Sequence, residues 1–309
     1  MSIHENMGPA VPQEYTFIRL ANMGNTCYIN SVLQSLFNTD MVANFCWHYS
    51  ETIKKHGLEK LVERTRLYLF SKIFIDSQNA PQNEVYYTPD YFLNALYEST
   101  DKFRRNEMGD SHELFLYLLQ NFDNSINEIN SRLGNEKLPL FSSFFMCETS
   151  SIASYNGTIT DDLKDIVPII GLNAKTMKDS IYYWENGLDI QDLNEGIDIN
   201  RKLTKFPDVL VLMPRVFTGM GKNFEKMKPE FKITISGQEY SLKSIIVHIG
   251  NDIHNGHYIC VFEVSERWVY GDDAEMRPLN DTEYHTFFET GYLPGQDTAI
   301  SYIFFYELL

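Results

Sequence analysis

Residues 22–31 read Asn-Met-Gly-Asn-Thr-Cys-Tyr-Ile-Asn-Ser, and this stretch decides how the first part of the chain folds. Asn25 and Thr26 are residue types that begin helices, and apolar side chains at three- and four-residue spacing follow them. The stretch therefore predicts a helix that starts at Cys27. Because a helix N-terminus carries partial positive charge, it favours a thiolate, and Cys27 is a candidate nucleophile. The amide of Asn22, just upstream, is a candidate donor to a developing oxyanion.

A second stretch, near the end of the chain, supplies an imidazole and a carboxylate. Residues 256–258 read Gly-His-Tyr, and residues 268–273 read Trp-Val-Tyr-Gly-Asp-Asp. Together they predict a hairpin with its turn near residue 265, in which the end of the second strand returns beside the start of the first. We therefore expect His257 and Asp272 to lie close together. There the carboxylate would hold the imidazole tautomer that accepts a thiol proton.

The 4 cysteines are sparse and irregularly spaced, which is typical of a reducing, intracellular compartment. Cys46, Cys147 and Cys260 fit the role of small buried side chains. The same explanation is open for Cys27, but a polar, turn-forming segment delivers that thiol, and a histidine and a carboxylate accompany it. The sequence has no Cys-x-x-Cys pair, no paired histidine ligands and no glycine-rich phosphate loop, so it predicts neither a metal nor a cofactor.

The histidine and the carboxylate have a structural explanation as well. His257 would be a surface histidine, and Asp272 would belong to an acidic turn. The chain has 8 histidines, and His248 and His254 are alternatives for the base. His248 falls within an earlier predicted strand, and His254 falls within the turn before His257. Spacing alone leaves these alternatives open.

The composition is that of an acidic globular chain. It has 309 residues, 43% of them hydrophobic, and a formal net charge of −16. The apolar content is that of a folded protein with a substantial core. The negative charge disfavours nucleic acid as a partner, because phosphates would be repelled. The N-terminus shows no signal-peptide pattern and no apolar run is long enough to cross a bilayer, so we expect an intracellular protein, cytoplasmic or nuclear, that does not bind membranes.

The order of the periodic patterns predicts an α+β fold. Residues 1–16 are polar and predict a flexible leader. Residues 27–125 carry mostly helical spacing, and short strands separated by turns dominate after about residue 137. Segments 173–205 and 214–230 are polar, and we expect them to be loops or insertions.

Several motifs carry a family resemblance, and they bracket residues 18 to 308. The matching segments are residues 22–31, 109–114, 247–250, 256–258, 268–273 and 299–306. They are similar to the cysteine box, the Gln-Gln-Asp-Ala-His-Glu-Phe segment, the histidine box and the closing strand of the ubiquitin-specific proteases, in that family's order.

The resemblance implies a papain-like cysteine protease hand. A helical thumb would take residues 17–137, and an antiparallel β palm with reduced fingers would take residues 138–309, within a single catalytic domain. It also implies cleavage of the isopeptide or peptide bond after the C-terminal Gly-Gly of ubiquitin. Ubiquitin or ubiquitinated proteins would then be the partners, and a regulatory protein partner is compatible with such a site.

Carried over to this chain, the resemblance assigns the catalytic roles. Cys27 would be the nucleophile, His257 the base and Asp272 the residue that orients it. Asn22 would donate to the oxyanion, and Asp273 would be a helper.

The resemblance also implies substrate-binding residues besides the catalytic ones. Asp110 and Tyr258 would help to bind the ubiquitin tail, whose arginines suit an acidic groove. Residues 138–245 would hold the fingers that grip the body of ubiquitin.

The sequence departs from the family pattern at several positions. Gly109 stands in place of the usual glutamine, and Gly271 stands in place of an aromatic residue. Many members carry two Cys-x-x-Cys zinc pairs in the fingers. The corresponding region of this chain has only Cys147, with Ser150 at its partner position. We therefore expect no structural zinc. Two further hypotheses stay open: a ubiquitin-binding scaffold without catalysis, and a protease for a ubiquitin-like modifier.

Overall fold

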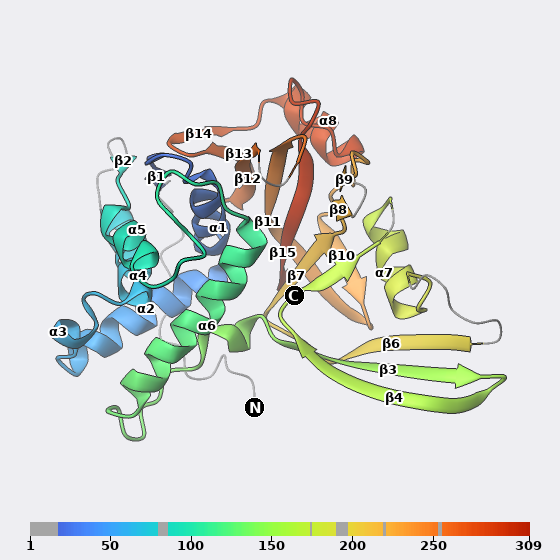
Figure 1. The fold of residues 1–309 in the computed structure, drawn as a ribbon, viewed down its shortest axis with the longest axis horizontal. Helices are drawn as coiled ribbons and strands as arrows, with labels where there is room; N and C mark the ends of the chain where they lie inside the picture. The colour runs from blue at the N-terminus through green and yellow to red at the C-terminus, as the bar shows by residue number, and fades with distance from the viewer. Residues whose placement is uncertain (1–17, 80–85, 174, 190–196, 219–220, 253–254) are drawn as a thin grey trace. The chain divides into compact units, whose positions relative to one another are not determined.

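The computed structural model describes residues 18–79, 86–173, 175–189, 197–218, 221–252 and 255–309 (Figure 1). The predicted leader, residues 1–16, lies outside this part of the chain. Two compact units make up the fold, and each is built from two separate stretches. The first unit takes its residues from Met1–Ser143 and His254–Pro278, and the second from Phe144–Ile253 and Leu279–Leu309.

The first unit combines helices with a short run of antiparallel strands. Its elements are β1 (Arg19–Leu20), α1 (Cys27–Phe37), α2 (Asp40–Lys55), α3 (Glu59–Val62), α4 (Arg66–Gln78), β2 (Tyr86–Tyr87), α5 (Asp90–Tyr97), α6 (Ser111–Asn130), β12 (Gly256–Val264), β13 (Arg267–Asp272) and β14 (Glu275–Pro278). Strands β12, β13 and β14 pair antiparallel in sequence order, and β1 pairs parallel with β2. A short 3₁₀ helix, η2 (Phe141–Phe144), follows α6.

Helix α1 is the centre of this unit. All 11 of its residues are buried, and it lies against α2, α6, β12 and β13. Its apolar residues supply much of the core, and its polar residues find partners on neighbouring segments. Ser31 Oγ, for example, lies 3.3 Å from Ser111 Oγ at the start of α6. The first residue of this buried helix is Cys27, so the packing that holds α1 also fixes the backbone of the thiol.

The second unit is mostly β. Its elements are β3 (Cys147–Tyr155), β4 (Thr158–Val167), β5 (Ile170–Leu172), α7 (Met177–Glu185), β6 (Ile197–Lys205), β7 (Val209–Pro214), β8 (Phe217–Thr218), β9 (Gly221–Lys222), β10 (Lys232–Ile235), β11 (Gln238–Gly250), α8 (Asp281–Thr290) and β15 (Ile300–Leu308). Strand β11 pairs antiparallel with β10 and β15, β15 pairs antiparallel with β7, and β7 pairs parallel with β5. A separate antiparallel sheet has the order β4-β3-β6, which Figure 1 shows as three long arrows.

One expectation from the sequence was wrong. Segment 173–205 is not a loop, because it contains α7 and β6. After residue 206, where strands dominate as predicted, α8 stands between β14 and β15 in the chain. Helix α8 begins with a capping box, in which the Asn280 side chain accepts from the Glu283 N–H and Glu283 accepts from the Asn280 N–H. That Asn-x-x-Glu signal was present in the sequence.

Among the described residues, no helix combines the length and the apolar character that a membrane crossing would need.

Both glycines that depart from the family pattern have a packing reason. A Cβ at Gly109 would lie 2.5 Å from two ring carbons of Tyr28, which is buried in α1. A Cβ at Gly271 would lie 2.9 Å from both Cys260 Sγ and a ring carbon of Phe262. In each place a neighbouring side chain already occupies the space that a larger residue would need.

We expect Gly109→Ala to lower the free energy of unfolding by roughly 1–3 kcal/mol, because the new methyl group overpacks the core at the Tyr28 ring. Urea denaturation would measure the change. Gly171→Ala is the matched control, since a Cβ there meets no atom within 4 Å. Equal stability of the two variants would contradict the packing explanation.

Candidate active site

A folded loop delivers Cys27 to the start of α1. Asn22 Oδ1 accepts from the Gly24 N–H at 2.9 Å, and Thr26 Oγ1 accepts from the Met23 N–H at 2.9 Å. Thr26 occupies the N-cap position of α1, as predicted, but its side chain accepts no N–H from the helix. The side chains of the loop therefore close the loop on itself. Cys27 is 2% exposed, and its N–H is among the first of the helix, which have no acceptor within the helix itself.

The hairpin of β12 and β13 brings the predicted base to the predicted carboxylate. Its turn is Ser265-Glu266, and both residues have positive φ, 48° and 63°. His257 Nε2 and Asp272 Oδ1 lie 2.6 Å apart. These two residues are neighbours, as strand pairing predicted, although they are far apart in sequence.

His257 bridges the carboxylate and the thiol. Its pKa is raised to about 10, first by the hydrogen bond to Asp272 and then by a hydrogen bond with Cys27, while burial opposes both. Because Nε2 faces Asp272, Nδ1 is the nitrogen left for Cys27. A raised pKa keeps the imidazole protonated at neutral pH, so His257 brings a positive charge to the site.

Tyr270 is a part of this arrangement that the sequence did not reveal. Its hydroxyl donates to Asp272 Oδ2 at 3.2 Å, so the carboxylate has a partner on each oxygen. Burial alone would raise the pKa of Asp272, but the hydrogen bonds from His257 and Tyr270 and the charge of His257 outweigh it and lower that pKa. The pKa of Tyr270 is raised by burial and by the charge of Asp272, so the phenol stays a donor. The Arg277 guanidinium lies 4.6 Å from the centre of the Tyr270 ring.

Asp273 faces a different pair of donors. Asn22 Nδ2 donates to its Oδ2 at 2.7 Å, and Asn30 Nδ2 donates to its Oδ1 at 2.7 Å. Asn30 was not among the predicted site residues. Its position three residues after Cys27, on the same side of a buried helix, was the signal available in the sequence.

The two residues predicted to bind the substrate tail contact each other. Asp110 is the N-cap of α6, and its Oδ1 accepts from the Glu113 N–H at 3.0 Å. Its Oδ2 accepts from the Tyr258 hydroxyl at 3.1 Å. Asp110 is 8% exposed and Tyr258 is 1% exposed. Their pairing joins the start of α6 to β12.

The rival histidines are placed elsewhere or lie outside the described residues. His248 is buried in β11 of the second unit, where Lys222 Nζ donates to its Nδ1 at 2.9 Å. His254 lies outside the described residues.

The residues of the β4-β3-β6 sheet do not fit a structural zinc. Cys147 Sγ donates to the Val167 carbonyl at 3.1 Å, and burial raises the pKa of this thiol to about 11. Zinc binds thiolates, and it usually takes four ligands. The family's partner position holds Ser150, so this part of the chain offers one protonated thiol in place of a pair.

Among the described residues, one group of histidine and carboxylates has metal-ligand spacing. It consists of His257, Asp272 and Asp273, whose ligand atoms lie within 4.8 Å of one another. Each of these side chains already has the hydrogen-bond partners described above, which explains their proximity. We therefore assign the group to the arrangement around Cys27 and not to a metal.

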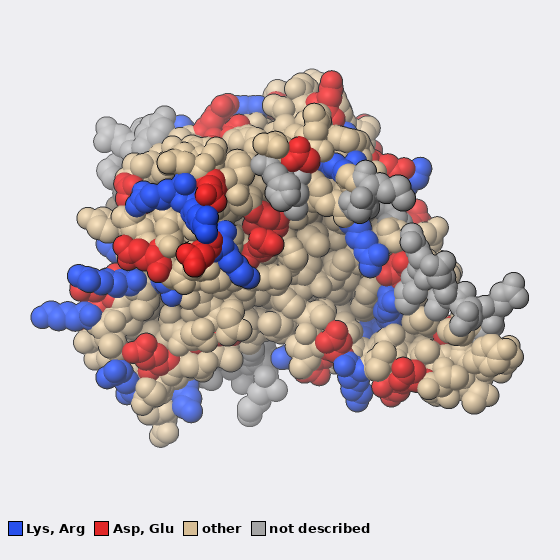
Figure 2. Space-filling model, in the orientation of Figure 1, with Lys and Arg blue, Asp and Glu red and all other residues tan. Residues whose placement is uncertain are grey.

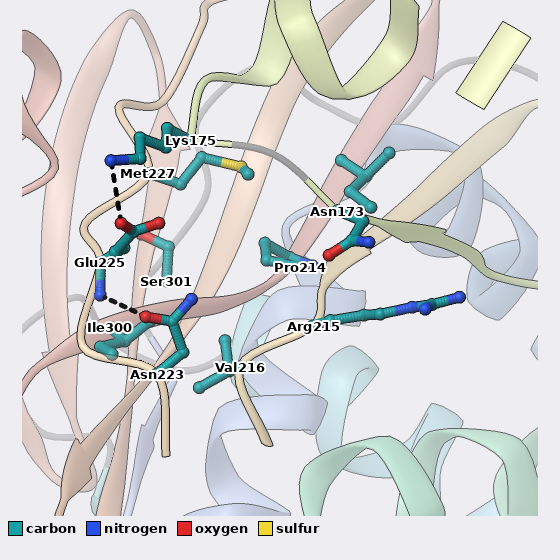
Figure 3. A pocket seen from close by; sticks show the side chains of 11 residues that line it. Asn173, Lys175, Pro214, Arg215, Val216, Asn223, Glu225, Met227, Ile300 and Ser301 are labelled. Atoms are coloured by element: carbon teal, nitrogen blue, oxygen red, sulfur yellow. Dashed lines mark hydrogen bonds and ion pairs between the residues drawn. The ribbon is translucent and has the colours of Figure 1, made fainter. Parts of the chain in front are cut away.

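A separate cavity of about 260 Å³ lies in the second unit (Figure 3). Lys175 Nζ and Glu225 Oε1 form an ion pair at 3.1 Å on one side of it. Ser301 also lines the cavity, and its hydroxyl is buried without a hydrogen-bond partner among the described residues. None of the residues predicted for the active site lines this cavity, and its walls bring no nucleophile and base together.

Comparison with known proteins finds one family along nearly the whole chain. The model of the family described as "Ubiquitin carboxyl-terminal hydrolase" matches residues 18–306. Ubiquitin carboxyl-terminal hydrolase 4 of Arabidopsis thaliana is 22% identical over 370 residues, which cover 99% of this chain and 97% of that protein. Probable ubiquitin carboxyl-terminal hydrolase 9 of Schizosaccharomyces pombe is 22% identical, over 94% of this chain and 65% of that protein.

Solved structures show the same fold. The SAGA Ubp8/Sgf11/Sus1/Sgf73 DUB module bound to ubiquitin aldehyde aligns with a TM-score of 0.77 and 16% identity, over 100% of this chain and 73% of that one. The same module bound to monoubiquitin aligns with a TM-score of 0.72 and 16% identity, over 99% of this chain and 72% of that one. The prediction of an α+β, papain-like hand is confirmed.

The raised pKa of His257 predicts a pH-dependent contribution to stability. Because the folded pKa of about 10 lies above the ordinary value of about 6.5, the protonated imidazole stabilises the fold fully below about pH 6.5. That contribution is lost as the pH rises through about 10. The difference in free energy of unfolding between wild type and His257→Gln should therefore be largest near pH 6 and disappear above pH 10, by urea denaturation at several pH values. His285→Gln, at an exposed position on α8, is the control, and a difference independent of pH would contradict the prediction.

Tyr270→Phe removes one donor from Asp272. We expect the pKa of Asp272 to rise, so that on acidification its pairing with His257 is lost at a higher pH than in wild type. Titration of the Asp272 carboxyl carbon by NMR would measure this. Tyr292→Phe, which removes a phenol bonded to Asp297 at 2.8 Å, is the control and should leave Asp272 unchanged. An unmoved Asp272 pKa in Tyr270→Phe would show that the contact has no effect on the carboxylate.

Proposed function

The chain belongs to the ubiquitin carboxyl-terminal hydrolase family, a family of deubiquitinases, and we propose that it hydrolyses the bond after the C-terminal Gly-Gly of ubiquitin with Cys27 as the nucleophile. One observation carries the catalytic assignment. His257 is hydrogen-bonded to Asp272 at 2.6 Å and lies near enough to Cys27 for that thiol to raise its pKa, which is the order of thiol, base and carboxylate that the chemistry needs.

The proposed reaction begins from the state in which the Cys27 proton has already passed to His257, so that a thiolate lies beside a protonated imidazole. The thiolate attacks the carbonyl carbon of the terminal glycine and forms a tetrahedral intermediate. Collapse of this intermediate expels the amine of the ubiquitinated lysine, which takes the proton from His257, and leaves a thioester on Cys27. A water molecule then loses a proton to His257 and attacks the thioester. Its breakdown releases the ubiquitin carboxylate and returns the proton to the thiol.

Asn22 and the backbone N–H of Cys27 are the proposed oxyanion donors. The Asn22 amide has two N–H groups, and one of them is used by Asp273. The other is free to donate to the negative oxygen of the intermediate. The Cys27 N–H lies at a helix N-terminus, where the dipole of α1 adds positive potential. Asp273 acts as the helper in this proposal, because it holds the Asn22 amide.

Substrate binding outside the reacting groups is part of the same proposal. Asp110 and Tyr258 would contribute to the tail site, where their mutual hydrogen bond fixes the start of α6 on β12. The sheet of β4, β3 and β6 would be the fingers that contact the body of ubiquitin. No zinc is assigned to that sheet, because the donors there do not fit one.

The proposed partners are ubiquitin, ubiquitinated proteins and a regulatory protein. In support, the Ubp8 structures, whose fold this chain shares, contain ubiquitin or ubiquitin aldehyde and further protein subunits. On the face drawn in Figure 2, lysine and arginine side chains are interspersed with aspartate and glutamate. Because the chain carries a net charge of −16, we propose neither nucleic acid nor a membrane as a partner. We also propose that the protein lies inside the cell, in the cytoplasm or nucleus.

A ubiquitin that carries an electrophile at its C-terminus should form a covalent adduct with this protein. We expect the adduct with wild type and with Cys260→Ala, and none with Cys27→Ala, by intact mass. Turnover of a fluorogenic ubiquitin conjugate should follow the same pattern. Adduct formation in Cys27→Ala would contradict the assignment of Cys27 as the nucleophile. Ubiquitin binding by the wild type without turnover would favour a non-catalytic scaffold. Parallel probes built on ubiquitin-like modifiers would show whether another Gly-Gly protein is the better substrate.

A further inference from the structure

The Asp273 carboxylate lies between two side-chain amides that come from different places in the chain. Asn22 Nδ2 belongs to the loop before α1, and Asn30 Nδ2 belongs to α1 itself, and each lies 2.7 Å from one carboxylate oxygen. Asp273 follows β13 with φ 52°, in the left-handed region that aspartate tolerates better than most residues. Hydrogen bonds to a charged group are stronger than neutral ones, so this bridge ties the loop to the helix firmly.

The Asn30 side chain can serve this bridge in one orientation only. Its Nδ2 faces three oxygens, on Asp273 at 2.7 Å, on Ala21 at 3.3 Å and on Leu20 at 3.5 Å. A flipped amide would place Oδ1 against these three acceptors. Asn30 is 1% exposed, and its Oδ1 has no hydrogen-bond partner among the described residues. The side chain is therefore a buried donor whose direction is fixed.

The Asn22 amide is held from both of its ends. Its Oδ1 accepts from the Gly24 N–H at 2.9 Å, and its Nδ2 donates to Asp273. Because the amide group is planar, these two bonds also fix the direction of the second N–H on Nδ2. A donor whose direction is set before the reaction stabilises an oxyanion better than one that must first reorient.

We propose that Asn30 is a positioning residue that acts through Asp273 to fix the Asn22 amide in the orientation of an oxyanion donor. This inference rests on the proposed function. Asn30 touches neither substrate nor reacting atoms, and its influence passes through one carboxylate. The two neighbouring aspartates thereby divide the work: Asp272 holds the base, and Asp273 holds the donor.

A purely structural role makes a different prediction. Asn30 also bonds the carbonyl oxygens of Leu20 and Ala21, so its loss would weaken the attachment of that segment to α1. Such weakening would lower stability and activity regardless of what stands at position 22. An effect that passes through Asn22 must disappear once Asn22 is gone.

A double-mutant cycle on ubiquitin-conjugate hydrolysis separates the two roles. We expect Asn30→Ala to lower kcat roughly 10- to 100-fold with little change in KM, below the ~10²–10³ expected for loss of an oxyanion donor. In an Asn22→Ala background, Asn30→Ala should have no further effect on kcat. Ser31→Ala is the matched control, because Ser31 is another buried polar residue of α1 and bonds Tyr28 and Ser111. Equal losses in both backgrounds would overturn the proposal.

NMR of the Asn22 side chain tests the proposal without a measurement of turnover. Together with Asp273→Asn it also tests the proposal if Asn30→Ala does not fold. The Asn22 side-chain amide resonances, assigned by their absence in Asn22→Ala, should shift in both Asn30→Ala and Asp273→Asn. If Asn30→Ala does not fold, Asp273→Asn alone tests the link, and its effect on kcat should also vanish in the Asn22→Ala background. Amide resonances that stay in place in Asp273→Asn would overturn the proposal even in an active enzyme. If the resonances shift in both variants but the wild type hydrolyses no ubiquitin conjugate, the proposed function fails and the bridge from Asn30 to Asn22 stands.

Discussion

The burial of α1 on all sides is the constraint on which the site depends. A helix buried in this way depends on partners inside the protein for the polar side chains it carries, because unpaired polar groups are costly there. Gln34 donates to the Ile18 carbonyl, Ser31 approaches Ser111, and Asn30 reaches Asp273. Each of these bonds ties down a segment from another part of the chain. The thiol at the helix start is consequently surrounded by groups whose positions the helix itself determines.

Two adjacent ionised carboxylates would repel each other unless each had its own compensation. Asp272 takes a hydrogen bond from the positive His257 and another from Tyr270, and Asp273 takes its two from the amides of Asn22 and Asn30. The turn after β13 makes this possible, since the positive φ of Asp273 directs its side chain to a different set of donors. Both charges are thus held close to Cys27, in a chain that is already strongly acidic.

Local patterns in the sequence predicted the parts of the site that local rules govern. The start of α1 and the β12–β13 hairpin each follow from short-range signals in the sequence. The pairing of the two hairpin strands brings His257 beside Asp272. Strand β6 was missed although covered and exposed residues alternate along it, because most of its side chains are polar. Tyr270 and Asn30 were missed for another reason. Their roles depend on which side chains meet across elements, and spacing along the chain carries no information about that meeting.

The departures from the family pattern are better explained by packing than by lost function. Tyr28 lies where a side chain at position 109 would begin, and Cys260 and Phe262, together with Met276 Sδ at 3.0 Å, surround position 271. In a closely packed interior, volume taken by one side chain is unavailable to another, so a large neighbour and a glycine form a matched pair. Gly271 also leaves the strand free to present its flanking residues, Tyr270 and Asp272, on the opposite face. Gly271 and the hydrogen bond between Tyr270 and Asp272 therefore lie on opposite faces of the same strand. The core fills the face of β13 at Gly271, and the charged site occupies the other face.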